Sequence, residues 1–144
     1  MFAGVLTTLP ALVLATPEHD AHTNAGRTAF KRGDLPAAAA EFEAAVKTAG
    51  TTAPAEFELP VALNNLAFVR ATQGRVAEAM PLYEQSLVLY RKLIPANDPD
   101  LAPQLVNVAA NYKTLGRYTD AKPLYQQVLS IWEAAKGLRL EIQS

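Results

Sequence analysis

The sequence predicts an all-α fold of three stacked helix pairs, and two observations support that prediction. One segment of the chain recurs at a fixed spacing, which is the signature of a repeat architecture. Within each copy the apolar residues recur every three and four positions, the period of an amphipathic helix. The chain has 144 residues, of which 50% are apolar and 19% are charged, so its composition suits a folded, short repeat array.

The two clearest copies lie 42 residues apart. The residues that coincide at this spacing include Leu63 and Leu105, Asn65 and Asn107, Ala67 and Ala109, Gly74 and Gly116, and the triplets Pro81-Leu82-Tyr83 and Pro123-Leu124-Tyr125. A more diverged copy lies 41 residues upstream, where Asn24, Gly33, Ala38, Phe42 and Val46 correspond to Asn65, Gly74, Ala79, Tyr83 and Leu87. The spacing therefore predicts three units, over about residues 19–48, 59–94 and 101–136.

Each unit is expected to form a helix, a turn and a second helix. In the second unit Leu63, Leu66 and Ala67 share one face, and Gly74 ends the first helix as a C-terminal glycine. The second helix is expected from about Val76 to Leu93. Small residues are expected where the two helices cross, with an aromatic ring one turn further on: Ala38 with Phe42, Ala79 with Tyr83, and Ala121 with Tyr125.

Two prolines and one glycine bear on the limits of the second helices. Pro81 and Pro123 occupy the same repeat position, several residues into a helix, which indicates either a local bend near the helix start or a later start. The last helix is expected to stop at Gly137, which leaves residues 137–144 as a C-terminal tail.

The pattern in each unit is a glycine, an alanine five residues on, an aromatic residue four further, and a pair of apolar or small residues after three more. The residues that carry it are Gly33, Ala38, Phe42 and Ala45-Val46; Gly74, Ala79, Tyr83 and Ser86-Leu87; and Gly116, Ala121, Tyr125 and Val128-Leu129. This pattern resembles the tetratricopeptide repeat. The second and third units resemble the 42-residue variety typified by kinesin light chains. Over residues 19–136 the resemblance implies a right-handed superhelical stack of three antiparallel helix pairs.

The resemblance further implies that the first helices line a concave groove that binds a protein or peptide. The candidate groove residues are Asn24, Arg27, Lys31, Asn64, Asn65, Phe68, Thr72, Asn107 and Thr114. An asparagine recurs at one position in all three units, and its amide can pair with a peptide backbone. The alternative is that the asparagines bond to neighbouring helices and fix the stacking. Phe68 is either an apolar anchor for the ligand or a core residue.

The charged residues limit which ligands are good candidates and argue against nucleic-acid binding. Arg27 and Lys31 could attract a carboxylate, but Thr72 and Thr114 stand at the positions equivalent to Lys31. A C-terminal acidic peptide is therefore a poor candidate, because the full set of basic residues that would clamp it is missing. A net charge of −1 gives no basic face for nucleic acid.

No catalytic or metal-binding constellation is evident in the sequence. The two histidines, His19 and His22, flank Asp20, and the chain has no cysteine to complete a metal site with them. No glycine-rich phosphate loop or nucleophile elbow is present. The sequence therefore predicts a protein without enzymatic activity, metal or cofactor.

The first fifteen residues predict export. From Phe2 to Ala15 the chain carries no charge, and this stretch is too short to cross a bilayer as a helix. It matches the apolar core of a signal peptide cleaved after Ala15, which would send the protein to the periplasm or outside the cell. Pro10 interrupts the stretch and no basic residue precedes it. The alternative is an apolar segment that packs on the first helix of a cytoplasmic protein.

The C-terminal end of the array has no further unit to cover it. Val128, Ile131 and Trp132 are expected to face outward there, whereas repeat arrays normally end in a polar capping element. Three possibilities follow: the tail folds over the end, the end pairs with a second copy, or the chain is a piece of a longer repeat protein. The second possibility predicts a homo-oligomer that assembles through the last repeat.

Overall fold

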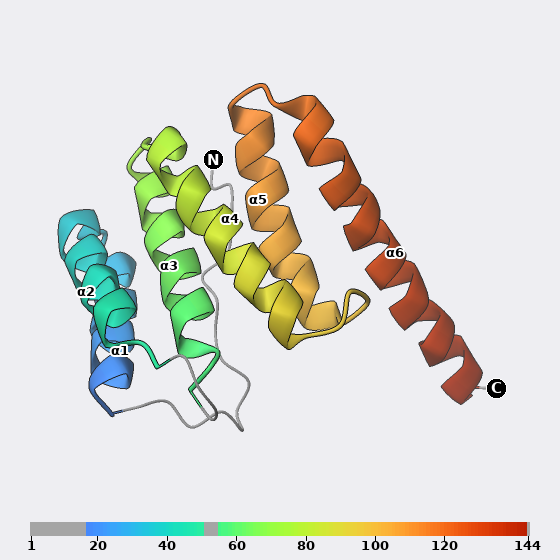
Figure 1. The fold of residues 1–144 in the computed structure, drawn as a ribbon, viewed down its shortest axis with the longest axis horizontal. Helices are drawn as coiled ribbons and strands as arrows, with labels where there is room; N and C mark the ends of the chain where they lie inside the picture. The colour runs from blue at the N-terminus through green and yellow to red at the C-terminus, as the bar shows by residue number, and fades with distance from the viewer. Residues whose placement is uncertain (1–16, 51–54, 144) are drawn as a thin grey trace.

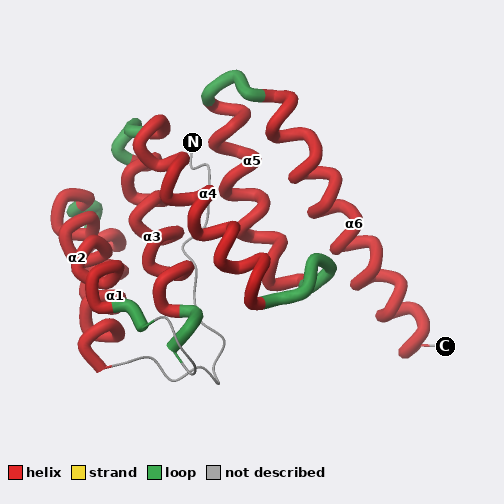
Figure 2. The backbone as a smooth tube through the Cα atoms, viewed as in Figure 1, coloured by secondary structure: helices red, strands yellow, loops and turns green. Residues whose placement is uncertain are grey.

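The computed structural model describes residues 17–50 and 55–143, and in these ranges it contains α-helices, one short 3₁₀ turn and no β-strand (Figures 1 and 2). The helices are α1 (Pro17–Lys31), α2 (Leu35–Thr48), α3 (Glu58–Thr72), α4 (Val76–Leu93), α5 (Ala102–Thr114) and α6 (Tyr118–Gln143), with the 3₁₀ turn η1 (Pro99–Leu101) before α5. The all-α prediction is confirmed. The expected signal segment, residues 1–15, lies outside the described residues.

The six helices form three consecutive pairs. α1 packs on α2, α3 on α4 and α5 on α6, while each second helix also packs on the first helix of the next pair, α2 on α3 and α4 on α5. Figure 1 shows the pairs following one another from α1 and α2 at one side to α6 at the other. Because each pair contacts only its neighbours, the core extends along the stack instead of closing around one centre.

The three turns between paired helices use a glycine in the left-handed region. Gly33, Gly74 and Gly116 have φ values of +78°, +81° and +75°. Each donates its backbone N–H to a carbonyl three residues earlier, at 2.9 to 3.0 Å. A residue with a Cβ atom is strained at such φ values, so the recurring glycine explains why each first helix ends where the sequence predicts.

The predicted small residues are buried at the helix crossings, and two of the three predicted aromatic residues, Phe42 and Tyr83, fill the core, whereas Tyr125 is only partly buried. Ala38, Ala79 and Ala121 are at most 3% exposed, while Phe42 and Tyr83 are buried against them. In the first pair the helices also approach closely at Gly26, where an added Cβ atom would lie 2.6 Å from the Phe42 ring. The equivalent positions in the other pairs carry Ala67 and Ala109, so Gly26 makes room that Phe42 occupies.

Both prolines lie inside helices. Pro81 follows the start of α4 at Val76, and Pro123 follows the start of α6 at Tyr118. Of the two alternatives, the later helix start is therefore wrong. Near the start of a helix a proline removes only one backbone hydrogen bond, and both side chains are exposed, so the remaining turns are retained.

The last helix differs from the prediction in two ways. α6 continues through Gly137 to Gln143, so the expected stop and the separate tail are wrong. A glycine inside a helix costs only about 1 kcal/mol, which the surrounding helix-forming residues offset. Since residues 137–143 extend the helix (Figure 1), they do not fold back over the end of the array.

The outward face of α6 also differs from the expected one. Val128 and Ile131 are 2% and 1% exposed and pack in the same cluster as Leu105 and Val108 of α5. The expectation that they face outward is wrong, because α6 turns this side toward its own partner helix. Trp132 is exposed as expected, together with Leu129. Among the described residues no helix is both long and apolar enough to cross a membrane.

Candidate functional site

The candidate groove face is formed by the three first helices, which lie next to each other in the order α1, α3, α5. The nine candidate residues on this face divide by burial. Asn24, Lys31 and Thr114 are exposed; Arg27 and Thr72 are partly buried; Asn64, Asn65, Phe68 and Asn107 are buried. The exposed members therefore lie mainly on α1 and at the C-terminal end of α5.

The asparagines connect helices inside the stack. The Asn107 amide nitrogen donates to the Asn64 amide oxygen at 3.0 Å, and both side chains are at most 1% exposed. Asn111 donates to the Asn107 carbonyl at 2.7 Å, one turn along α5. A buried amide is costly unless it is hydrogen-bonded, so the Asn64–Asn107 bond fixes how α5 sits on α3. This geometry favours the stacking role over the ligand ladder for these two residues.

The three equivalent asparagines do not share one environment. Asn24 is exposed on α1, whereas Asn65 and Asn107 are 0% exposed. Equivalence in sequence therefore places them at the same helical position but not on a continuous exposed strip. Of the three asparagines, Asn24 on α1 is therefore the one most accessible to a ligand.

Phe68 lies in the core. Its side chain is 6% exposed, and its ring centroid lies 5.2 Å from that of Phe30 on α1, with the two ring planes 56° apart. Tilted aromatic pairs at this distance are a favourable packing arrangement. Of the two predicted roles for Phe68, the position fits the core role.

The threonines at the end of the face are satisfied within their own helices. Thr72 donates its hydroxyl to the Phe68 carbonyl at 2.8 Å, and Thr114 donates to the Ala110 carbonyl at 3.0 Å. This bond to the carbonyl four residues earlier leaves the hydroxyl oxygen able to accept a further hydrogen bond. These side chains could therefore serve a ligand as acceptors.

A polar contact between consecutive units recurs, and the sequence analysis missed it. Glu43 of α2 pairs with Arg70 of α3, and the equivalent Glu84 of α4 accepts a hydrogen bond from the Tyr112 hydroxyl of α5 at 2.7 Å. Arg117 lies 3.9 Å from Glu84 and 4.4 Å above the Tyr112 ring. The repeat spacing could have revealed this contact, because Glu43 and Glu84 are equivalent positions and so are Arg70 and Tyr112.

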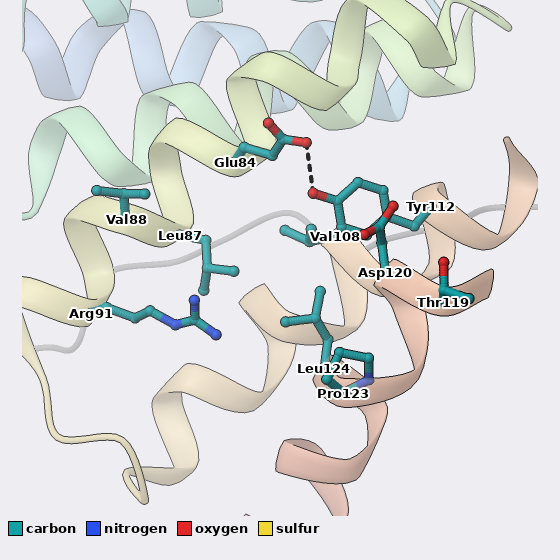
Figure 3. A pocket seen from close by; sticks show the side chains of 10 residues that line it. All are labelled: Glu84, Leu87, Val88, Arg91, Val108, Tyr112, Thr119, Asp120, Pro123 and Leu124. Carbon is teal, nitrogen blue, oxygen red and sulfur yellow. Dashed lines mark hydrogen bonds between the residues drawn. The ribbon is translucent and has the colours of Figure 1, made fainter. Parts of the chain in front are cut away.

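An open pocket of about 370 Å³ lies beside this contact, between α4, α5 and α6 (Figure 3). Leu87, Val108 and Leu124 supply its apolar surface. At one end of the pocket Glu84 faces Tyr112, and Arg91 extends from α4 at the other (Figure 3). The Glu84 carboxylate accepts a hydrogen bond from the Tyr112 phenol and lies near the Arg117 guanidinium, so the pocket joins an apolar recess to this polar cluster.

Tyr112 should make the stability of the fold fall in strongly alkaline solution. Burial, with the hydrogen bond to the Glu84 carboxylate second, raises the pKa of Tyr112 to about 12. The unfolded phenol ionises near pH 10, so between about pH 10 and 12 the folded state binds the extra proton. The free energy of unfolding should therefore decrease as pH rises through this window. Burial also raises the pKa of Tyr83, which adds to the same decrease.

Urea unfolding at pH 9, 10, 11 and 12 measures this decrease. Tyr112→Phe removes the ionisable group and should make the decrease shallower, while Tyr118→Phe, at a side chain that is 64% exposed, serves as the matched control. An unchanged pH dependence in Tyr112→Phe would show that Tyr112 does not couple folding to this ionisation.

The histidines join α1 to the second helix of its pair. His19 is buried, with Nδ1 positioned to donate to the Ala45 carbonyl at 3.0 Å, and Nδ1 of His22 lies 2.8 Å from the Glu41 carboxylate. Across residues 17–50 and 55–143, no group of three or more histidine, cysteine, aspartate or glutamate side chains is arranged to hold a metal ion. Both imidazoles thus act in packing α1 on α2.

The succession of helix pairs defines the class of protein as an α-solenoid. Two tetratricopeptide-repeat family models match the sequence, one over residues 58–135 and the other over residues 9–54. The comparison with curated proteins finds no relative that matches. Because the first match covers more than half of the chain, the chain belongs to the tetratricopeptide-repeat family. Repeats of this family are generally protein–protein interaction modules.

Proposed function

We propose that this chain binds a peptide or a segment of another protein along the face of α1, α3 and α5. The observation that carries the proposal is that these first helices lie adjacent in the stack, with α3 and α5 joined by the buried Asn64–Asn107 bond. A face held in shape before binding loses less conformational entropy when a partner docks. Binding without chemical conversion accords with the family and with the engaged polar groups of the pocket.

The exposed side chains of the face supply the contacts in this proposal. Lys31 and Asn24 are exposed on α1, and Thr114 is exposed at the end of α5. The lysine and asparagine can donate to carbonyl or carboxylate oxygens, and the threonine oxygen can accept from an amide. The expected ligand is therefore an extended segment with an acidic or carbonyl-rich portion near α1. The buried asparagines support the helices that present these groups.

The location of the protein is part of the proposal. The charge-free stretch from Phe2 to Ala15 supports export, so the partner is expected in the periplasm or outside the cell. A chain that retained these residues after synthesis would instead favour the cytoplasmic alternative. Mass spectrometry of the N-terminus of the protein from its native source separates the two.

Site-specific crosslinking tests the groove. A photoreactive amino acid at position 31 of α1 should capture the partner, whereas the same group at Lys47 of α2 or Lys92 of α4, both exposed on second helices, should not. The double variant Asn24→Ala/Lys31→Ala loses two contacts in this proposal and should bind a captured partner about tenfold more weakly, equivalent to about 1.4 kcal/mol. Equal capture from all three positions, or an unchanged affinity, would overturn the proposal.

Assembly through the end of the array is a second candidate function, favoured by one specific observation. Leu129 and Trp132 of α6 are 55% and 56% exposed, whereas the equivalent residues of α4, Leu87 and Tyr90, are 5% and 4% exposed. The inner residues are buried because a following unit covers them. The outer residues present the same kind of surface without that cover, which supports self-association through the last repeat.

A further inference from the structure

The inner junction between α4 and α5 shows what kind of element covers a second helix. Leu87 and Tyr90 of α4 share one buried cluster with Leu101, Leu105 and Val108, which lie in or next to α5. The cover is thus the first helix of the following unit. Any element that replaces it on α6 must meet Leu129 and Trp132 as α5 meets Leu87 and Tyr90.

α1 is the first helix that the structure describes, so no described helix packs on its outer face. Within the chain this face of a first helix packs against the second helix before it, as Leu66 of α3 packs with Phe42 of α2. The residue of α1 equivalent to Leu66 and Val108 is Ala25, and the residue equivalent to Ala62 and Gln104 is Ala21. Both alanines are exposed. α1 therefore offers a shallow face of small residues where α6 offers a large indole and a leucine.

Charge is matched at the ends of the two faces. In the inner junction Ile94, just after α4, packs near Leu101 in the same cluster. By repeat spacing Lys136 of α6 corresponds to Ile94, and Glu18 of α1 corresponds, through Leu59, to Leu101. Ile94 is extended after α4, whereas Lys136 lies within the longer helix α6. Both charged side chains are exposed. The α6 end thus carries an exposed lysine and the α1 end an exposed glutamate, two side chains of opposite charge.

Neither α6 nor α1 carries its half of the recurring glutamate contact. Glu43 and Glu84 are replaced on α6 by Gln126, and their partners Arg70 and Tyr112 are replaced on α1 by Ala29. Bringing α1 against α6 therefore buries no carboxylate or guanidinium without a partner at this position. An unpaired buried charge would oppose association strongly.

We propose that copies of this chain associate head to tail, with the outer face of α1 of one copy packed on the outer face of α6 of the next. The inference rests on the assembly function given above as the second candidate, and it identifies the surface of the second copy. Such an interface uses two different patches, so it does not close at a dimer, and the mean mass should rise with concentration beyond two chains.

Complementation between two blocked variants tests the inference. Leu129→Glu blocks the α6 end and Ala25→Glu blocks the α1 end, and both residues are exposed, so folding should be retained and is checked by circular dichroism. By sedimentation equilibrium the parent chain should exceed the mass of two chains, and each variant alone should remain a monomer. A mixture of the two variants should form a dimer and nothing larger.

Control variants on the inner helices test whether any added glutamate blocks association. Ala40→Glu on α2 and Val88→Glu on α4, at exposed positions away from both ends, should associate as the parent does. Glu18→Lys should weaken association at least about tenfold, and Lys136→Glu in the same chain should restore it. A parent chain that stays monomeric, or Ala25→Glu that still dimerises through α6, would overturn the head-to-tail arrangement.

Self-association and groove binding can fail independently, and two measurements separate them. A chain that remains monomeric but still captures a partner from position 31 would retain groove binding and lose the head-to-tail interface. A chain that associates through α1 and α6 but captures nothing from position 31 would give the reverse result.

Discussion

Phe42→Ala should lower the free energy of unfolding by about 3–5 kcal/mol, the largest effect expected from a single substitution in this chain. Phe42 is 0% exposed and belongs to the cluster that joins α2 to Leu66 and Val69 of α3. It also fills the space left by Gly26 on α1. Removing the ring leaves a cavity at the meeting point of three helices, which the rigid helical backbones cannot fill by relaxing.

Urea unfolding followed by circular dichroism measures this loss. Val88→Ala, at a side chain that is 52% exposed, is the control and should change the free energy of unfolding by less than about 0.5 kcal/mol. Because each pair contacts only its neighbours, α1 and α2 should unfold before the rest in the Phe42 variant. A loss below about 1 kcal/mol would mean that the first pair is not packed as described.

Asn107→Ala should cost about 2–3 kcal/mol, because it removes a buried side chain and the donor to Asn64. A double-mutant cycle isolates the bond between them. If each amide depends on the other, Asn64→Ala combined with Asn107→Ala should cost about 1 kcal/mol or more below the sum of the single variants.

The same variants separate the two roles considered for the asparagines. Asn24→Ala, at the exposed equivalent on α1, should leave the free energy of unfolding within about 0.5 kcal/mol of the parent. Additive effects of Asn64→Ala and Asn107→Ala would contradict the stacking role. Unchanged stability of Asn107→Ala together with lost partner binding would instead favour a direct ligand contact.

Much of the fold was predictable because local signals repeat. The glycines at the turns, exemplified by Gly74 with φ of +81°, mark a conformation that other residues adopt only with strain. The alanines at the crossings mark positions where two helices must approach. Such constraints act within one helix pair, so a sequence that carries them three times predicts three pairs.

The candidate site was predictable only in part. The repeat spacing identified equivalent positions, but Asn24 is exposed where Asn65 is buried, and Leu129 is exposed where Leu87 is buried. Equivalent residues share a helical position, whereas their burial depends on which element lies against them. Asn24 and Leu129 lie in the first and last described units, where no further described unit lies against them, so their environments differ from the inner unit for reasons that no local pattern contains.

The sequence by itself determined the all-α class, the number of helix pairs, the glycine turns and the membership in a repeat family, since each follows from periodicity and from backbone preferences that act over a few residues. Only the tertiary structure decided that α6 runs on through Gly137, that Val128 and Ile131 face inward, and that Asn64 and Asn107 bond across the stack. The burial of Val128 and Ile131 and the Asn64–Asn107 bond depend on contacts between residues far apart in the chain, which exist only once the pairs are packed on one another. The continuation of α6 is instead a local balance of helix propensities around Gly137.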